Sequence, residues 1–191
     1  RILEVLLKDL TLKHTITSMS KEINMSRVGV WKVLKKLEGI HLILLSPVGE
    51  GKTSTYNISL NWENPVLEKT LSLRLTEESI KSQKWLSNFK ELEKEVDFLL
   101  IYGSILHSIK DANDIDILII TNKNNFLNIE KIIKEIQKAQ IKKIHATNLT
   151  TLEFINELKK PNKIFIDAIK KGIVLFGQEK FIKFMKELHK K

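Results

Sequence analysis

The 191-residue chain contains no cysteine. It therefore forms no disulfide bond and offers no thiolate to a metal ion, which fits a reducing compartment. It also lacks an apolar run long enough to cross a membrane, and its first residues show no signal-peptide pattern. We therefore expect a cytoplasmic protein without a membrane partner. The chain has no internal repeat and no low-complexity segment.

What the chain has in excess is positive charge. Lysine and arginine number 32 against 23 aspartates and glutamates, which gives a net charge of +9. Hydrophobic residues make up 42% of the chain and charged residues 29%, the proportions of a soluble globular protein. The excess charge favours a polyanionic partner, either nucleic acid or nucleotide. Because it is spread over both halves of the sequence, it does not locate a site.

The most informative feature is a pair of aspartates at the start of an apolar run. Asp114 and Asp116 open the stretch DIDILII, whose apolar residues predict a buried strand. Because side chains alternate between the faces of a strand, the two carboxylates lie on the same face and close together. Like charges held this close repel each other unless a cation lies between them, and hard oxygen ligands suit Mg²⁺. The pair therefore predicts a metal site.

A second motif precedes the aspartates. Gly103 and Ser104 follow an apolar strand predicted over 96–102, and we expect them to open a short helix. A helix N-terminus preceded by glycine presents free backbone N–H groups that bind phosphate. Each motif alone is more often structural, since Asn113-Asp114 is a good turn starter and Gly-Ser can end a strand and cap a helix. Together they indicate chemistry on a nucleoside triphosphate.

This arrangement resembles the nucleotidyltransferase superfamily that includes DNA polymerase beta, and especially its minimal members. Their signature is Gly-Ser, a spacer of about ten residues and Asp-x-Asp at a strand start. The spacer here, residues 105–113, is one residue shorter, and Ser108 takes the position of a small residue or glycine. The resemblance extends from about residue 85 to the C-terminus. It implies a nucleotide-binding pair, Gly103 and Ser104, and a catalytic pair that holds Mg²⁺ or Mn²⁺, Asp114 and Asp116.

One acidic residue of that family pattern is missing. Active nucleotidyltransferases usually bring a third carboxylate from the strand after the aspartate pair, but the strand predicted over 141–148 contains no acid. His145 is the nearest titratable residue to that position. A neutral His145 could act as a base, although a surface or packing role is more common and is the one we favour. Glu153 and Asp167 are poorer substitutes, because the helices that hold them need not face the site.

The rest of the C-terminal half predicts an α/β (α+β) domain over residues 96–191, with a mixed sheet flanked by helices. The spacing of apolar residues predicts helices over 127–139 and 179–189 and a short strand over 173–176. Thr150 and Glu153 have the spacing of a capping box at the start of another helix. By resemblance, this domain has the nucleotidyltransferase fold.

The N-terminal residues predict a different small domain, residues 1–62. Three helices are expected, over 2–10, over 17–23 and after the cap residue Ser26, followed by a hairpin with a glycine-rich tip. This order resembles the winged helix-turn-helix of prokaryotic transcription regulators. Residues 63–95 predict linking helices, which could also form the seam of a homodimer.

The third helix of this N-terminal domain is amphipathic. Val30, Val33, Leu34 and Leu37 form an apolar stripe at helical spacing. The resemblance implies that the opposite face enters the major groove of double-stranded DNA and that the hairpin touches the flanking backbone. A solvated face is the commoner role for such lysines. The DNA-binding residues implied are Arg27, Lys32, Lys35 and Lys52.

Two functions are compatible with these motifs. The first is metal-dependent transfer of a nucleoside monophosphate from a nucleoside triphosphate to an unknown acceptor, coupled to a DNA-binding winged helix, a fusion that resembles a group of mostly archaeal proteins. The alternative is a DNA-binding transcription regulator whose nucleotidyltransferase fold is catalytically silent and senses nucleotide or mediates dimerisation. The missing third carboxylate favours the alternative.

Overall fold

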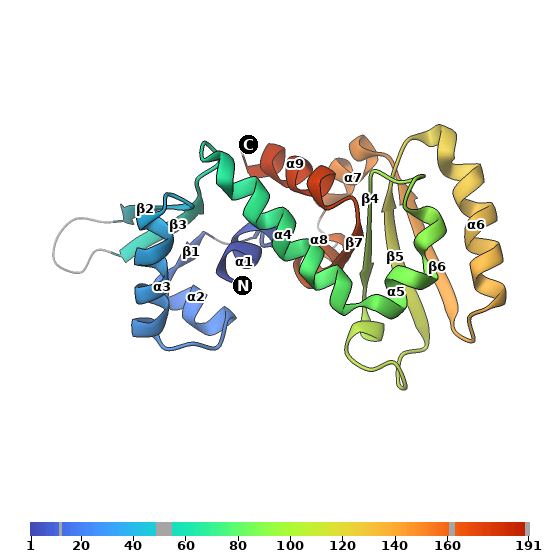
Figure 1. Cartoon of the computed structure of the whole chain (residues 1–191), viewed down its shortest axis with the longest axis horizontal. Coiled ribbons are helices and arrows are strands. Elements are labelled where there is room, and N and C mark those ends of the chain that lie inside the picture. Colours follow the sequence, from blue (N-terminus) through green and yellow to red (C-terminus); the bar gives the residue numbers. More distant parts are fainter. Residues whose placement is uncertain (12, 49–54, 161–162, 190–191) are drawn as a thin grey trace. The chain divides into compact units, whose positions relative to one another are not determined.

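The computed structural model describes residues 1–11, 13–48, 55–160 and 163–189 (Figure 1). The chain divides into two compact units, one formed by Arg1–Ser72 with Met185–Lys191 and the other by Leu73–Phe184. Within the described ranges, no helix combines the length and the apolar character needed to span a membrane.

Up to residue 60, the described part of the first unit contains three helices and a three-stranded antiparallel sheet. The helices are α1 (Ile2–Lys8), α2 (Ile16–Glu22) and α3 (Arg27–Gly39). The strands are β1 (His14–Thr15), β2 (Ile43–Val48) and β3 (Thr55–Leu60), in the order β1-β3-β2. The three predicted helices and both hairpin strands are present with slightly different ends, whereas the short strand β1 was not predicted. Lys52 and the hairpin tip lie outside the described residues.

Local sequence explains why α3 begins and packs as it does. The hydroxyl of Ser26 accepts a hydrogen bond from Gly29 N–H, which caps the helix as predicted. Val30 and Leu34 are fully buried, so the predicted apolar stripe faces the core of this unit. On the flank of the helix, the Trp31 ring packs on Tyr56 of β3 with ring centroids 5.6 Å apart.

The second unit is built around a four-stranded sheet in the order β6-β5-β4-β7 (Figure 1). Its strands are β4 (Phe98–Tyr102), β5 (Asp114–Ile120), β6 (Lys143–Leu149) and β7 (Ile173–Phe176). β5 and β6 are parallel and the other pairs are antiparallel, which confirms the predicted mixed sheet. The parallel pair needs a crossover, and helix α6 (Phe126–Lys138) supplies it.

Helices cover both faces of this sheet, because β5 is apolar on both faces beyond its first residues. Ile115, Ile117 and Ile119 pack against residues of α5 (Gln83–Asn88), of the turn η1 (Lys90–Leu92) and of α6. On the opposite face, Phe98 contacts the rings of Phe154, Phe181 and Phe184. These rings come from α7 (Thr151–Leu158) and α9 (Gln178–His189), and α8 (Ile164–Lys171) lies between them in the chain.

Capping and linking segments complete the unit. The predicted capping box is confirmed, because Thr150 Oγ1 accepts from Glu153 N–H and the Glu153 carboxylate accepts from Thr150 N–H.

The predicted linking region forms a long helix, α4 (Pro65–Lys81), followed by α5 and η1. The division between the two units falls within α4 and within α9.

Candidate active site

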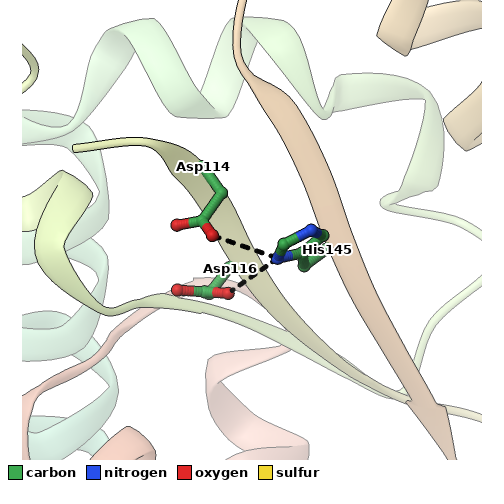
Figure 2. A group of neighbouring side chains, drawn as sticks. All are labelled: Asp114, Asp116 and His145. Carbon is green, nitrogen blue, oxygen red and sulfur yellow. Dashed lines mark ion pairs between the residues drawn. The ribbon is translucent and has the colours of Figure 1, made fainter.

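The two aspartates are positioned by the strand that they open. Residues 117–120 of β5 are fully buried, which fixes the strand in the core and leaves its first residues at the edge. Asp114 and Asp116 point to the same face, as the alternation of side chains predicts (Figure 2). Their side chains remain 31% and 28% exposed, so both carboxylates are open to a ligand from solvent.

The parallel neighbour β6 brings a histidine to the same place. Asp116 lies opposite His145 in the register of the two strands. His145 Nδ1 is 3.2 Å from Asp114 Oδ2 and 3.7 Å from Asp116 Oδ1 (Figure 2). The His145 side chain is 48% exposed, in keeping with the surface position expected from the sequence, and its imidazole also faces both carboxylates. No acid stands on β6, so this strand brings no third carboxylate to the site.

The closeness of the two carboxylates affects proton binding. Burial of the carboxyl group raises the pKa of Asp116, the negative charge of Asp114 raises it further, and His145 acts in the opposite direction. Tyr102 lies opposite Asp116 on the other neighbouring strand, β4. Burial and the charge of Asp116 raise the pKa of the Tyr102 hydroxyl, although its hydrogen bond with the Thr147 side chain lowers it. Three strands thus contribute polar groups to one row across the sheet.

Two features of the structure require glycine at position 103, next to Asp116. Its φ angle is +84°, in the left-handed region that favours glycine. A Cβ atom at this position would lie 2.5 Å from Asp116 Oδ2, which is closer than real side chains approach. Only glycine therefore lets the chain turn here while the Asp116 carboxylate keeps its place.

Ser104 begins a shorter element than the predicted helix. The segment η2 (Ser104–Leu106) is a single 3-10 turn, and its carbonyl at Ser104 accepts from His107 N–H and Ser108 N–H. Ser108 organises the loop that follows, because its hydroxyl donates to Asp111 Oδ2 at 2.6 Å and accepts from Asp111 N–H at 3.3 Å. The shortened spacer is thus an ordered turn.

A cavity of about 310 Å³ adjoins the Gly-Ser turn. Its lining includes Tyr102, Gly103, Ser104, Ala168, Asp167 and Lys171. The position of α8 at this place was not predicted, yet Asp167 and Lys171 of that helix line the cavity. A second cavity of about 620 Å³ shares Leu106 and His107 with the first and is lined by three lysines, Lys81, Lys84 and Lys110.

The donor atoms of the site fit a divalent cation. In the ranges that the structure describes, one group of side chains could hold a metal ion, namely Asp114, Asp116 and His145, whose ligand atoms all lie within 4.8 Å of one another. Carboxylate oxygens are ligands for hard divalent cations, and the imidazole nitrogen is a third donor. The missing Cβ of Gly103 leaves space beside Asp116 Oδ2.

The predicted DNA-binding residues belong to the first unit. Arg27, Lys32 and Lys35 are exposed on the outer side of α3. Lys35 forms a short ion pair with Glu38, and its ammonium lies 5.4 Å from the centre of the Trp31 ring. Lys32 pairs with no acidic residue in the described part of the chain.

The mixed sheet, the covering helices and the acidic row at one strand end define an α/β domain with a candidate metal-binding site. A family model described as "Polymerase beta, Nucleotidyltransferase" matches residues 84–181, just over half of the 191-residue chain. The chain therefore belongs to this nucleotidyltransferase family. Comparison with curated proteins and with solved structures gave no match.

Proposed function

We propose that the second unit transfers a nucleoside monophosphate from a nucleoside triphosphate to an acceptor hydroxyl group. The observation that carries this proposal is the placement of Asp114 and Asp116 beside the Gly103 turn, within the residues matched by the nucleotidyltransferase family. The acceptor oxygen attacks the α-phosphorus, the bond between that phosphorus and the β-bridging oxygen breaks, and pyrophosphate leaves.

Each residue has a role in this scheme. The turn at Gly103 and Ser104 holds the β- and γ-phosphates through backbone N–H groups. Asp114 and Asp116 hold a divalent metal ion, which when bound neutralises phosphate charge and orients the α-phosphorus. Asp116 Oδ2, which lies beside Gly103, is placed to accept the proton of the acceptor hydroxyl.

Turnover tests this proposal directly. The full chain is incubated with nucleoside triphosphates labelled at the α-phosphorus, a divalent cation and a cell extract. Transfer of label to an acceptor is expected for the wild type and is expected to vanish in the double variant Asp114→Asn, Asp116→Asn. Equal labelling by the wild type and the double variant would refute the assignment of the site.

A second candidate function is a regulator that binds nucleotide without transferring it. The absence of an acid on β6, where His145 stands instead, is the observation that favours it. In this case the wild type binds labelled triphosphate with a metal-dependent affinity but labels no acceptor under any of the conditions above.

We further propose that the first unit is a winged helix-turn-helix that binds double-stranded DNA. Its element order, α1-β1-α2-α3-β2-β3, and the exposed basic face of α3 support this proposal. Arg27 and Lys32 contact the DNA directly, and Lys35 joins them once it leaves Glu38. Lys52 is proposed as the contact from the hairpin tip.

A homodimer through α4 completes the proposal. Val66, Leu73 and Ile80 are all more than half exposed and follow one another at seven-residue spacing, the repeat of a helix-pairing seam. Light scattering is expected to give the mass of a dimer for the wild type and of a monomer for Leu73→Glu. The exposed control Leu127→Glu on α6 should leave the mass unchanged.

A further inference from the structure

The donor set of the site is unusual for a magnesium enzyme, because one of its three ligand groups is an imidazole. Two carboxylates from β5 and the Nδ1 atom of His145 from β6 face the same small space (Figure 2). Mg²⁺ strongly prefers oxygen ligands, whereas imidazole nitrogen suits first-row transition-metal ions. A site with two carboxylates and one imidazole therefore discriminates between the two classes of cation.

The distances from His145 to the two carboxylates are close to those between neighbouring ligands of a metal ion. An ion about 2.1 Å from each of two neighbouring ligands separates them by about 3.0 Å in octahedral and about 3.4 Å in tetrahedral geometry. His145 Nδ1 is 3.2 Å from Asp114 Oδ2 and 3.7 Å from Asp116 Oδ1. All three donor atoms lie within 4.8 Å of one another, so adjustment of these partly exposed side chains can bring them to one ion.

The His145 imidazole is not held by a hydrogen bond to either carboxylate. In the described part of the chain, the imidazole is within ion-pair distance of both carboxylates but forms a hydrogen bond with neither. The side chain is 48% exposed, so a cation from solvent can reach Nδ1 without unfolding the strand edge. The rigid parallel pairing of β5 and β6 fixes the position from which His145 acts.

We propose that Asp114, Asp116 and His145 form a three-ligand site that binds a first-row transition-metal ion, such as Mn²⁺ or Co²⁺, in preference to Mg²⁺. His145 is the residue that sets this preference. The inference rests on the proposed function, because it specifies the metal ion of the same site.

The test measures metal binding by the full, untagged chain, without nucleotide. Titration with MnCl₂, CoCl₂ and MgCl₂, followed by calorimetry, is expected to give affinities for Mn²⁺ and Co²⁺ at least about tenfold above that for Mg²⁺. Tenfold is the lower end of the loss in metal affinity when a partner outside the ligand shell is removed, and a direct ligand contributes at least as much. Pulsed electron paramagnetic resonance of the Mn²⁺-loaded protein is expected to show hyperfine coupling to one imidazole nitrogen.

Variants identify the residue responsible. His145→Asp, which replaces the nitrogen by oxygen, should abolish the nitrogen coupling and lower the ratio of Mn²⁺ to Mg²⁺ affinity by about tenfold or more. His145→Asn should also lose the coupling and keeps the proposal testable if the aspartate variant fails to fold. As a matched control, His41→Asn removes an exposed imidazole from the first unit at a positive φ angle that asparagine tolerates. This control should retain both the coupling and the ratio.

The outcomes separate this inference from the proposed function. Equal affinity for Mg²⁺ and Mn²⁺, or Mn²⁺ binding without nitrogen coupling, overturns the inference even where labelled nucleotide is transferred. Nitrogen coupling that is lost in His145→Asp supports the inference even where no transfer occurs, in which case it is the proposed transfer that fails.

Discussion

Replacing Asp116 by asparagine should stabilise the protein when no metal ion is bound. The pKa of Asp116 is raised, first by burial and then by the charge of Asp114, with His145 acting against both. A carboxyl group whose folded-state pKa is raised stabilises the fold at low pH, and this contribution is lost as the pH rises from the unfolded-state pKa through the folded-state pKa. At neutral pH the ionised carboxylate therefore opposes folding, and the amide removes this effect while keeping the shape.

The expected magnitude is small, because solvent screens the site. The Asp116 side chain is 28% exposed, and interactions between partly exposed charges are worth about 0.2–1 kcal/mol. We therefore expect the free energy of unfolding to rise by about 0.5 kcal/mol in Asp116→Asn. In a chain of this length that corresponds to a rise in Tm of about 1–2 °C.

Urea unfolding at neutral pH with a chelator measures this difference. In saturating MnCl₂ the order should reverse, since a ligand at about 100 times its Kd adds about 2.7 kcal/mol to the wild type and the variant lacks one ligand. Below about pH 4, where aspartate is protonated, the two proteins should become similar. A variant that is less stable than the wild type in chelator would show that attraction to His145 exceeds the repulsion, and would refute the reasoning.

Asp97→Asn is the matched control for that experiment. Its side chain is 32% exposed, close to the value for Asp116, but it forms an ion pair with Lys180 at 2.7 Å. Removing this charge should leave stability unchanged or lower it slightly, and MnCl₂ should stabilise the control as much as the wild type.

Three further predictions concern the turn, the DNA-binding face and the metal. Gly103→Ala should destabilise the fold by about 1–3 kcal/mol in urea unfolding, through backbone strain and the clash with the Asp116 carboxylate, whereas Gly39→Ala, where a Cβ meets nothing within 4 Å, should not destabilise it. Lys32→Ala should reduce the slope of log affinity for duplex DNA against log salt by about 0.9. Lys35→Ala should change this slope less, because Lys35 is paired with Glu38. Equal slopes in the wild type and both variants would show that these lysines do not contact DNA. Asp114→Asn should weaken metal-dependent triphosphate binding in calorimetry, and an unchanged affinity would mean that Asp114 is not a ligand.

The sequence predicted β5 and its aspartates well because the signal is local. Alternation within one strand places Asp114 and Asp116 on one face, and the apolar residues after them require burial. The partner of these aspartates could not be predicted in the same way. Parallel pairing across a crossover helix leaves no local trace of register, and a shift by one residue would have turned His145 to the other face of the sheet.

The sequence could have predicted the ion pair of Lys35, but not the steric requirement for glycine at position 103. The ion pair of Lys35 with Glu38 has the i, i+3 spacing that brings side chains together on a helix, so its competition with DNA binding could have been anticipated. The clash that a side chain at position 103 would make with Asp116 could not have been anticipated. It depends on how closely the Asp116 carboxylate of β5 approaches the turn after β4. The motif predicts a glycine for phosphate binding, and the structure adds a steric requirement set by the metal ligand.

The placement of α8 leads to a last prediction, which tests where the triphosphate lies. Asp167 and Lys171 are one helical turn apart and line the cavity that also contacts Gly103 and Ser104. A unit charge about 4 Å away contributes about 1 kcal/mol in water and less at longer range. Removing the negative charge in Asp167→Asn should therefore raise the affinity for a nucleoside triphosphate by roughly twofold to fivefold, and Lys171→Gln should lower it by a similar factor.

Both changes in affinity should shrink at high salt, since exposed charges are screened, and neither variant should alter the binding of MnCl₂ alone. Lys134→Gln is the control, because this exposed lysine lies on α6, which covers the opposite face of the sheet. If Asp167→Asn and Lys171→Gln bind triphosphate as the wild type does, the phosphates do not enter this cavity. If both lower the affinity, α8 supports the site through its fold rather than through its charge, because opposite charges must act on an anion with opposite sign.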